Sequence, residues 1–203
     1  LLALVVDLRT APIRWYTQPL ATLNVDRWLA SAPFHGAIVQ LPLRQDDQYL
    51  YLLRSTTHHR SMLNGVSGAS PPLYDRIVAL QASDPIAPDF IDALERLRLS
   101  LVVVHVDLLA DRAPAVRDWL RQQIRDGRLT FVRQFSDSLQ GDFVFALTRT
   151  EPRASWLRAP EVPDRAGRTP LQNLEMFLNN EGRRYCYVTF GMIDSPPPGL
   201  RVK

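Results

Sequence analysis

Continuous apolar runs alternate along this chain with segments whose apolar residues recur every three or four positions. The continuous runs, which are rich in β-branched residues, predict buried strands. They lie at Ala3–Leu8, Gly36–Leu41, Leu99–Val106, Leu129–Phe135 and Phe143–Thr148. The spaced apolar residues predict amphipathic helices. These lie at Asn24–Ser31, Asp46–Thr56, Ser70–Gln81, Pro88–Arg98 and Ala113–Asp126.

The alternation of strands with helices indicates βαβ units. We therefore expect an α/β fold with three layers, in which a mostly parallel sheet carries helices on both faces. The short linker DSLQGD between the last two strands predicts a hairpin. A hairpin pairs its strands in opposite directions, so we expect an antiparallel edge of the sheet there.

The composition changes after Thr150, where the chain becomes rich in Pro, Arg and Ala without a visible period. Such a segment is typical of an irregular excursion over a domain surface. We therefore expect an α/β domain over residues 1–149 and an irregular Pro- and Arg-rich extension over residues 150–203. Within the extension, the pattern predicts a short helix at Leu171–Asn179 and one or two strands, including Arg184–Phe190.

The overall composition is that of a globular protein, with 46% hydrophobic and 22% charged residues. The net charge is +3, and the basic residues are spread along the chain instead of forming a stripe. No nucleic-acid-binding module is visible, so we expect no nucleic-acid partner. The single cysteine, Cys186, excludes an internal disulfide and a cysteine-rich metal site.

The polar stretch Tyr49–Pro72 (YLYLLRSTTHHRSMLNGVSGASPP) separates a predicted strand from a predicted helix. Polar groups with special backbone needs at such a position are typical of a binding or catalytic loop. Two further polar residues end the strand VVVHVD, and ligands of open parallel sheets gather beyond the carboxyl ends of the strands. If the two strands are neighbours, all these groups converge at one rim. The candidate binding residues are His58, Arg60, Asn64, Gly65, Ser67, His105 and Asp107.

A structural interpretation of the same residues stays open, in which the motif organises its own loop. The pair Asn64-Gly65 predicts a turn with positive φ, and a histidine can bond to backbone carbonyls. The known templates for chemistry do not fit. His58 and His59 are adjacent and point opposite ways in an extended chain, and the string Gly65-Val66-Ser67-Gly68 lacks the last spacing of a nucleophile elbow. Because metal-ligand and nucleotide-binding motifs are also absent from the sequence, we expect no metal and no cofactor.

Several of these residues carry a family resemblance. Leu41-Pro42 ends one predicted strand and Val104-His105 ends another. Between them stands the run Tyr51-x-x-x-Ser55-Thr56-x-His58-x-Arg60-x-x-x-Asn64-Gly65-x-Ser67-Gly68, followed by Pro71. In this order the residues resemble the soluble C-terminal domain of bacterial multi-spanning GT-C-type, polyprenyl-phosphate-dependent glycosyltransferases, including the protein mannosyltransferase-like group. The resemblance covers Trp28–Asp107 and departs from the family pattern at His59, Ser61 and Val66.

The resemblance implies that the chain is the C-terminal, extracytoplasmic part of a longer protein of the bacterial inner membrane, in which LLALVV follows the last membrane helix. The catalytic carboxylates of such transferases lie in the membrane part. We therefore expect no catalytic residue here, and a role as an accessory domain of a polyprenyl-phosphate-sugar-dependent glycosyltransferase. The implied partners are the chain's own upstream membrane domain and an acceptor, a glycan or a polyprenyl-phosphate sugar.

Two other classes of function stay open. A free-standing small hydrolase would use His58 or His105 as its base, and it predicts a deep pocket around that residue. A structural or interaction domain predicts instead a buried motif whose polar groups bond to one another.

Overall fold

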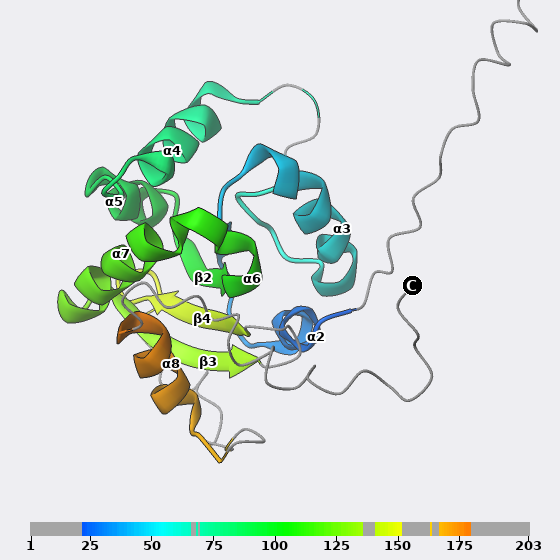
Figure 1. Ribbon diagram of the computed structural model, residues 1–203. Helices are drawn as coiled ribbons and strands as arrows, with labels where there is room; N and C mark the ends of the chain where they lie inside the picture. The colour runs from blue at the N-terminus through cyan, green and yellow to red at the C-terminus, as the bar shows by residue number, and fades with distance from the viewer. Residues whose placement is uncertain are drawn as a thin grey trace, which may run out of the picture.

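The fold is built around a mixed sheet of four strands (Figure 1). The computed structural model describes residues 22–65, 68, 70–135, 141–151, 163 and 167–179. In this part of the chain the strands are β1 (Ala37–Leu41), β2 (Leu99–His105), β3 (Leu129–Phe135) and β4 (Asp142–Leu147), in the spatial order β1-β2-β4-β3. The predicted strands Ala3–Leu8 and Arg184–Phe190 lie outside the described residues.

Strand β4 alone runs against the direction of the other three. β1 and β2 are parallel, whereas β4 is antiparallel to both of its neighbours, β2 and β3. The predicted α/β class is confirmed, and the last two strands form the expected antiparallel pair. The sheet is less parallel than expected because β4 lies between β2 and β3. All six residues of β4 are buried, whereas four of the seven residues of β3 are partly exposed, so β4 suits the inner position and β3 the edge.

Seven α-helices are described around this sheet. They are α2 (Asn24–Ser31), α3 (Gln48–His58), α4 (Pro72–Ala82), α5 (Asp89–Arg96), α6 (Val106–Leu109), α7 (Ala113–Arg125) and α8 (Pro170–Asn179). Short 3₁₀ turns, Gln45–Asp47 and Ala110–Arg112, precede α3 and α7. Every helix except α6 was predicted from the apolar spacing. The single-turn helix α6 follows β2 directly and is too short to show a period.

Two apolar cores lie on the two faces of the sheet. Val102 and Val104 of β2 belong to the core that also contains residues of α4, α5, α6, α7 and α8. Leu101 and Val103 of the same strand belong to the second core, with Leu29 and the rest of the buried side of α2. This alternation is the two-residue period of a strand that is buried on both faces. The three predicted layers are therefore present, with five helices contributing to the core on one face and α2 on the other.

The described part of the C-terminal extension packs into the first core. Phe177 of α8 stacks on Phe143 of β4, with 5.1 Å between ring centroids. The amide of Asn173 donates to the Gln134 side chain of β3 at 3.0 Å. The predicted helix at Leu171–Asn179 is confirmed, and it belongs to the same packed unit as the sheet. The expected division at residue 149 stays a prediction, because most of the extension lies outside the described residues.

Candidate functional site

The loop that follows α3 lies along the outer edge of β1. The Ile38 N–H donates to the Ser61 carbonyl, and the Leu63 N–H donates to the Ile38 carbonyl, both at 2.9 Å. At Gln40, the next hydrogen-bonding position of β1, the partner is the Asn64 side chain instead of the loop backbone. Its Nδ2 donates to the Gln40 carbonyl, and its Oδ1 accepts from the Gln40 N–H, both at 2.7 Å. An asparagine amide offers the donor and acceptor of a peptide group, so Asn64 extends the hydrogen-bond ladder of β1 by one step.

Gly65 occupies a backbone position that favours glycine. Its φ is +86°, and a Cβ added to it would lie 2.5 Å from the Cε of Met62. The predicted positive-φ turn at Asn64-Gly65 is therefore confirmed at its glycine. The Gly65 N–H donates to Oε1 of Gln48 at 2.8 Å, which ties the turn to the first residue of α3.

Arg60 binds the carboxyl end of α2. Its guanidinium donates to the carbonyls of Leu29 at 2.8 Å, Ala30 at 3.2 Å and Ala32 at 2.7 Å. It also donates to the carbonyl of Phe34 at 3.2 Å, and its Cζ lies 4.5 Å from the centroid of the Phe34 ring. The last carbonyls of a helix have no partner within the helix, and they carry the negative end of its dipole. Arg60 therefore holds α2 to the loop after α3.

The two adjacent histidines at the end of α3 differ in burial and backbone conformation. His58 is the last residue of the helix and is 2% exposed, whereas His59 takes the left-handed conformation with φ of 52° and is exposed. Nδ1 of His58 accepts from the Arg60 N–H at 3.0 Å, and its Nε2 is buried without a hydrogen-bond partner among the described residues. Burial, and then the charges of Arg60 and His59, lower the pKa of His58 to about 4. His58 is therefore neutral in the folded protein at neutral pH.

His105 stands at the centre of a second, buried group of polar side chains. It is 1% exposed, Nδ1 lies 2.7 Å from Oδ1 of Asp142, and Nε2 lies 2.8 Å from Oε1 of Gln40. The Tyr51 ring stacks on the imidazole at 5.6 Å between centroids. One guanidinium nitrogen of Arg54 is 3.2 Å from both ring nitrogens. That equal spacing places it over the ring face, because an in-plane approach would collide with the carbon between the two nitrogens.

Further buried charge surrounds this ring. Asp26 of α2 is 1% exposed, and burial raises its pKa against the opposing charges of Arg54 and His105. One carboxylate oxygen of Asp26 and one of Asp142 are buried without a hydrogen-bond partner among the described residues. The phenol of Tyr51 donates to the Pro42 carbonyl at 3.0 Å, and burial raises its pKa well above 10. Polar groups in such a low-dielectric setting interact strongly and hold one another in place.

The structure brings some of the candidate residues together and separates others. Asn64 and His105 meet at Gln40, which Asn64 binds through its backbone and His105 through its side chain. His58 and Arg60 bind one another and turn towards α2. Asp107 is exposed on α6, two residues beyond His105. Ser67 lies outside the described residues.

The arrangement fixes the orientation of the His105 imidazole but keeps the ring buried. A carboxylate that orients a histidine through Nδ1 occurs in acid–base catalysis, but a general base must come within hydrogen-bond reach of its substrate. Both side chains of the His105–Asp142 pair are only 2% exposed. The pair therefore links β2 to β4 in this conformation without offering a nitrogen to a substrate.

Sequence reasoning missed half of this site. Five residues of the site were not among the candidates. Gln40, Arg54 and Asp142 contact His105 or Asn64, Gln48 binds the Gly65 N–H, and Asp26 adds a buried carboxyl group nearby. One signal was present, since Gln40 is a polar residue within the apolar run AIVQL. A buried polar side chain in a central run needs a partner, which makes it informative. The other four depend on strand and helix neighbours that are distant in the sequence.

The comparisons with known proteins add no relative: no protein-family model, curated protein or solved structure matches this chain significantly. Among the described residues, no three His, Cys, Asp or Glu side chains gather so that they could hold a metal ion. Over the same ranges, none of the helices combines the length and hydropathy needed to cross a bilayer.

Proposed function

We propose that this chain is a non-catalytic accessory domain of a membrane glycosyltransferase-like protein, attached to its own upstream membrane domain on the extracytoplasmic side of the bacterial inner membrane. Its role is to bind an acceptor, a glycan or a polyprenyl-phosphate sugar, or to shape the mouth of the active site. One observation carries the non-catalytic part of this proposal. Among the described residues, the polar side chains behind the family resemblance form most of their hydrogen bonds with other groups of the fold itself.

Four of those residues support this view. Arg60 binds four carbonyls at and beyond the end of α2, and Asn64 pairs with the backbone of β1. Tyr51 connects the Pro42 carbonyl to the ring of His105. A motif that is used in this way identifies a fold and leaves the reaction to another part of the protein.

The hydrolase alternative is less well supported. It requires His58 or His105 to reach a substrate, and these side chains belong to residues that are 2% and 1% exposed. The lowered pKa of His58, about 4, leaves it neutral at neutral pH but makes it a weak base. We therefore favour the accessory role over a free-standing enzyme.

Two experiments test the proposal. The coding sequence upstream of Leu1 should encode several apolar spans, and an open reading frame that starts at Leu1 would overturn the membrane-protein part. The isolated chain should not hydrolyse nitrophenyl esters or nitrophenyl phosphate. Turnover that is lost in a folded His58→Asn or a folded His105→Asn variant would instead establish the hydrolase.

The binding role needs its own measurement. Titration of the isolated chain with glycans and with a water-soluble polyprenyl-phosphate sugar should give saturable shifts in its NMR spectrum. No shift at about 1 mM ligand, which corresponds to roughly 4 kcal/mol of binding free energy, would remove the ligand-binding role and leave only that of shaping the active-site mouth.

A further inference from the structure

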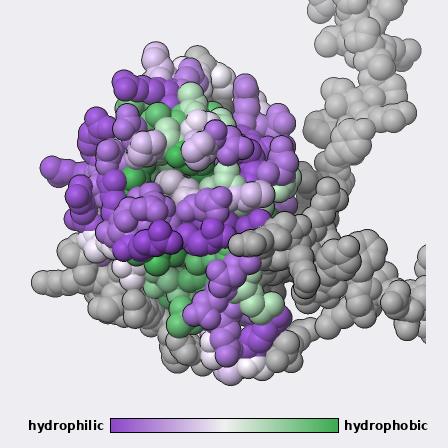
Figure 2. All heavy atoms as spheres, turned by 60° about the vertical axis from the view of Figure 1, so that its left-hand side comes forward, coloured by the Kyte–Doolittle hydropathy of each residue, from purple (hydrophilic) through white to green (hydrophobic). Residues whose placement is uncertain are grey.

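An apolar groove lies between α4 and α5, and none of its lining residues belongs to the His105 site. Its floor consists of Leu73, Ile77, Leu80, Ala93 and Leu97, and its volume is about 230 Å³. Arg76, Asp89 and Arg96 complete the lining. Figure 2 shows this side of the molecule, where apolar side chains lie among hydrophilic ones. Leu73 and Leu97 are 55% and 37% exposed, so the groove presents apolar surface to water.

The size of the groove favours side chains over a whole small molecule. Sites for drug-sized ligands enclose roughly 300–1,000 Å³, and this groove falls below that range. A groove between two helices is the geometry in which an amphipathic helix docks, with a few apolar anchors on one of its faces.

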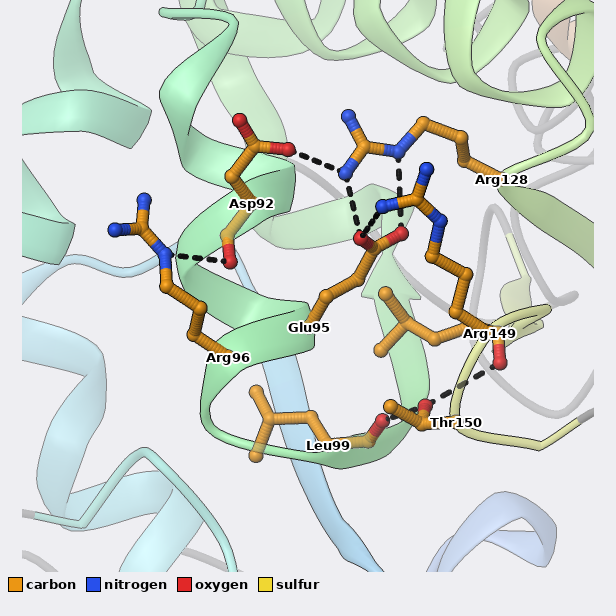
Figure 3. Close-up of polar contacts among 8 residues, drawn as sticks. Asp92, Glu95, Arg96, Leu99, Arg128, Arg149 and Thr150 are labelled. Atoms are coloured by element: carbon orange, nitrogen blue, oxygen red, sulfur yellow. Dashed lines mark hydrogen bonds and ion pairs between the residues drawn. The ribbon is translucent and has the colours of Figure 1, made fainter.

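The charge on the rim follows from the ion pairs beside it. Figure 3 shows that two of the three carboxylates of α5, those of Asp92 and Glu95, are turned towards Arg128 and Arg149. Arg96 points to the other side of the helix and donates only to the Asp92 carbonyl. Within the described part of the chain, neither Arg76 nor Arg96 makes an ion pair.

The rim therefore carries two guanidinium groups against one carboxylate, that of Asp89. Because both guanidiniums are free of ion pairs, an incoming helix with acidic residues would be favoured over a basic one.

Helix α3 of the same chain presents the complementary surface. Tyr49, Leu52 and Leu53 are 68%, 39% and 43% exposed. Their spacing of three and four residues places them on one stripe of the helix. Asp46 and Asp47 lie immediately before this stripe, and Asp46 is fully on the surface, whereas Asp47 lies 3.7 Å from Arg44. An apolar stripe that begins with the exposed carboxylate of Asp46 matches an apolar groove with guanidiniums on its rim.

We propose that copies of this chain associate head to tail, with the α3 stripe of one copy in the α4–α5 groove of the next. The two surfaces lie on different elements, so the contact is heterologous, and an associated pair still has one free groove and one free stripe through which further copies can add. This proposal goes beyond the accessory role and does not depend on it. A failure of self-association would leave the experiments on sugar binding and hydrolysis unaffected.

The test uses the full chain and two complementary variants. Leu73→Asp places a charge in the groove, and Leu53→Asp places one on the stripe. Both residues are substantially exposed, so the fold should tolerate the change, and thermal unfolding checks this. In sedimentation velocity, the wild-type chain should form species that grow with concentration, while each variant alone should stay monomeric.

The decisive sample is an equimolar mixture of the two variants. One copy then supplies the intact groove and the other the intact stripe, so the mixture should form dimers and nothing larger. A symmetric contact through α3 alone, or unspecific association of apolar patches, gives no such recovery. Leu171→Asp on α8, a leucine that is 45% exposed, is the matched control and should associate like the wild type.

The charge complementarity has a separate readout. Arg96→Glu should lower the association constant about tenfold, and Asp46→Arg in the partner copy should restore part of the loss. The proposal is overturned if the wild-type chain is monomeric at about 1 mM, because its association free energy would then be weaker than roughly 4 kcal/mol. It is also overturned if the variant mixture stays monomeric. An acidic amphipathic peptide that binds the groove while the chain itself does not associate would assign the groove to another protein.

Discussion

Two polar networks in this protein join distant elements with similar residues, and they differ in burial. The first links α3, β1, β2 and β4 through contacts of His105 with Arg54, Gln40 and Asp142, and His105 is 1% exposed. The second links α5 to the ends of β3 and β4 through Glu95, Arg128 and Arg149 (Figure 3), and the Arg149 side chain is 71% exposed. Burial therefore decides how much stability is lost when a polar contact of either network is removed.

A buried polar group that loses its partner cannot turn to water, whereas an exposed one can. The His105 network therefore demands a fixed geometry, and the Glu95 network tolerates change. The four predictions below test this difference, beginning with the largest expected effect.

Removal of the central ring should destabilise the protein most. His105→Ala leaves a cavity and removes the imidazole partner of the buried Asp142 carboxyl group, and removing one partner of such a buried pair costs about 3–5 kcal/mol. Urea denaturation should show a free energy of unfolding that is lower by about this amount. His35→Ala is the matched control, because His35 is exposed. A loss of less than about 1 kcal/mol at His105 would mean that the buried network contributes little to the fold.

Mild acid should weaken the fold through His58. The pKa of His58 is about 4 in the folded protein and ordinarily 6.5. Between about pH 6.5 and 4, His58 is protonated in the unfolded chain but neutral in the folded chain. The free energy of unfolding therefore falls as the pH is lowered through this range, and it levels off below about pH 4. The shift corresponds to about 2–3 kcal/mol over this interval.

Asp26 acts in the opposite sense and must be separated from this effect. Burial raises its pKa above 3.8, so the stability that it contributes falls as the pH rises from 3.8 through the raised value. His58→Asn isolates the histidine, because an asparagine keeps an acceptor for the Arg60 N–H and does not titrate. The difference in unfolding free energy between wild type and variant should change between pH 6.5 and 4, and a constant difference would contradict the assignment.

The loop on β1 should give an intermediate effect. Asn64→Ala leaves the Gln40 N–H and carbonyl without their partner, which costs about 1–3 kcal/mol. Thermal unfolding should show a clear drop in the midpoint. The comparison variant is Asn24→Ala on the exposed surface of α2. Equal effects at the two asparagines would remove the special role of the Asn64 side chain.

The surface network should give the smallest effect. Arg149→Ala removes one exposed ion pair with Glu95, and such pairs contribute less than about 1 kcal/mol. The remaining effect should disappear at about 1 M salt, where charges separated by more than roughly 3 Å are screened. A loss as large as that expected for His105→Ala would abolish the contrast between the two networks.

The fold was largely predictable because its signals are local. The period of apolar residues defined the helices on either side of each strand, and β2 is apolar enough to be recognised alone. The position of β4 was not predictable in the same way. A hairpin signal fixes the pairing of β3 with β4, but it does not say which of the two lies next to β2.

The site was predictable only in part, for the same reason. Asn64-Gly65 and His105 were found because they are unusual in their own segments. Asp142 and Gln40 became partners of His105 through the sheet register, which pairs His105 with Asp142 across β2 and β4. Arg60 was identified as polar, but its carbonyl partners come from α2, which lies about thirty residues earlier in the chain.

The loop that carries Asn64 has a consequence for solubility as well as for stability. β1 is the outermost strand on its side of the described sheet, and an open strand edge invites another chain to add a strand. Ser61, Leu63 and Asn64 occupy positions along that edge which a foreign strand would need. Loss of this cover would expose a template for growing fibres, so aggregation should accompany damage to the loop even where most of the domain stays folded.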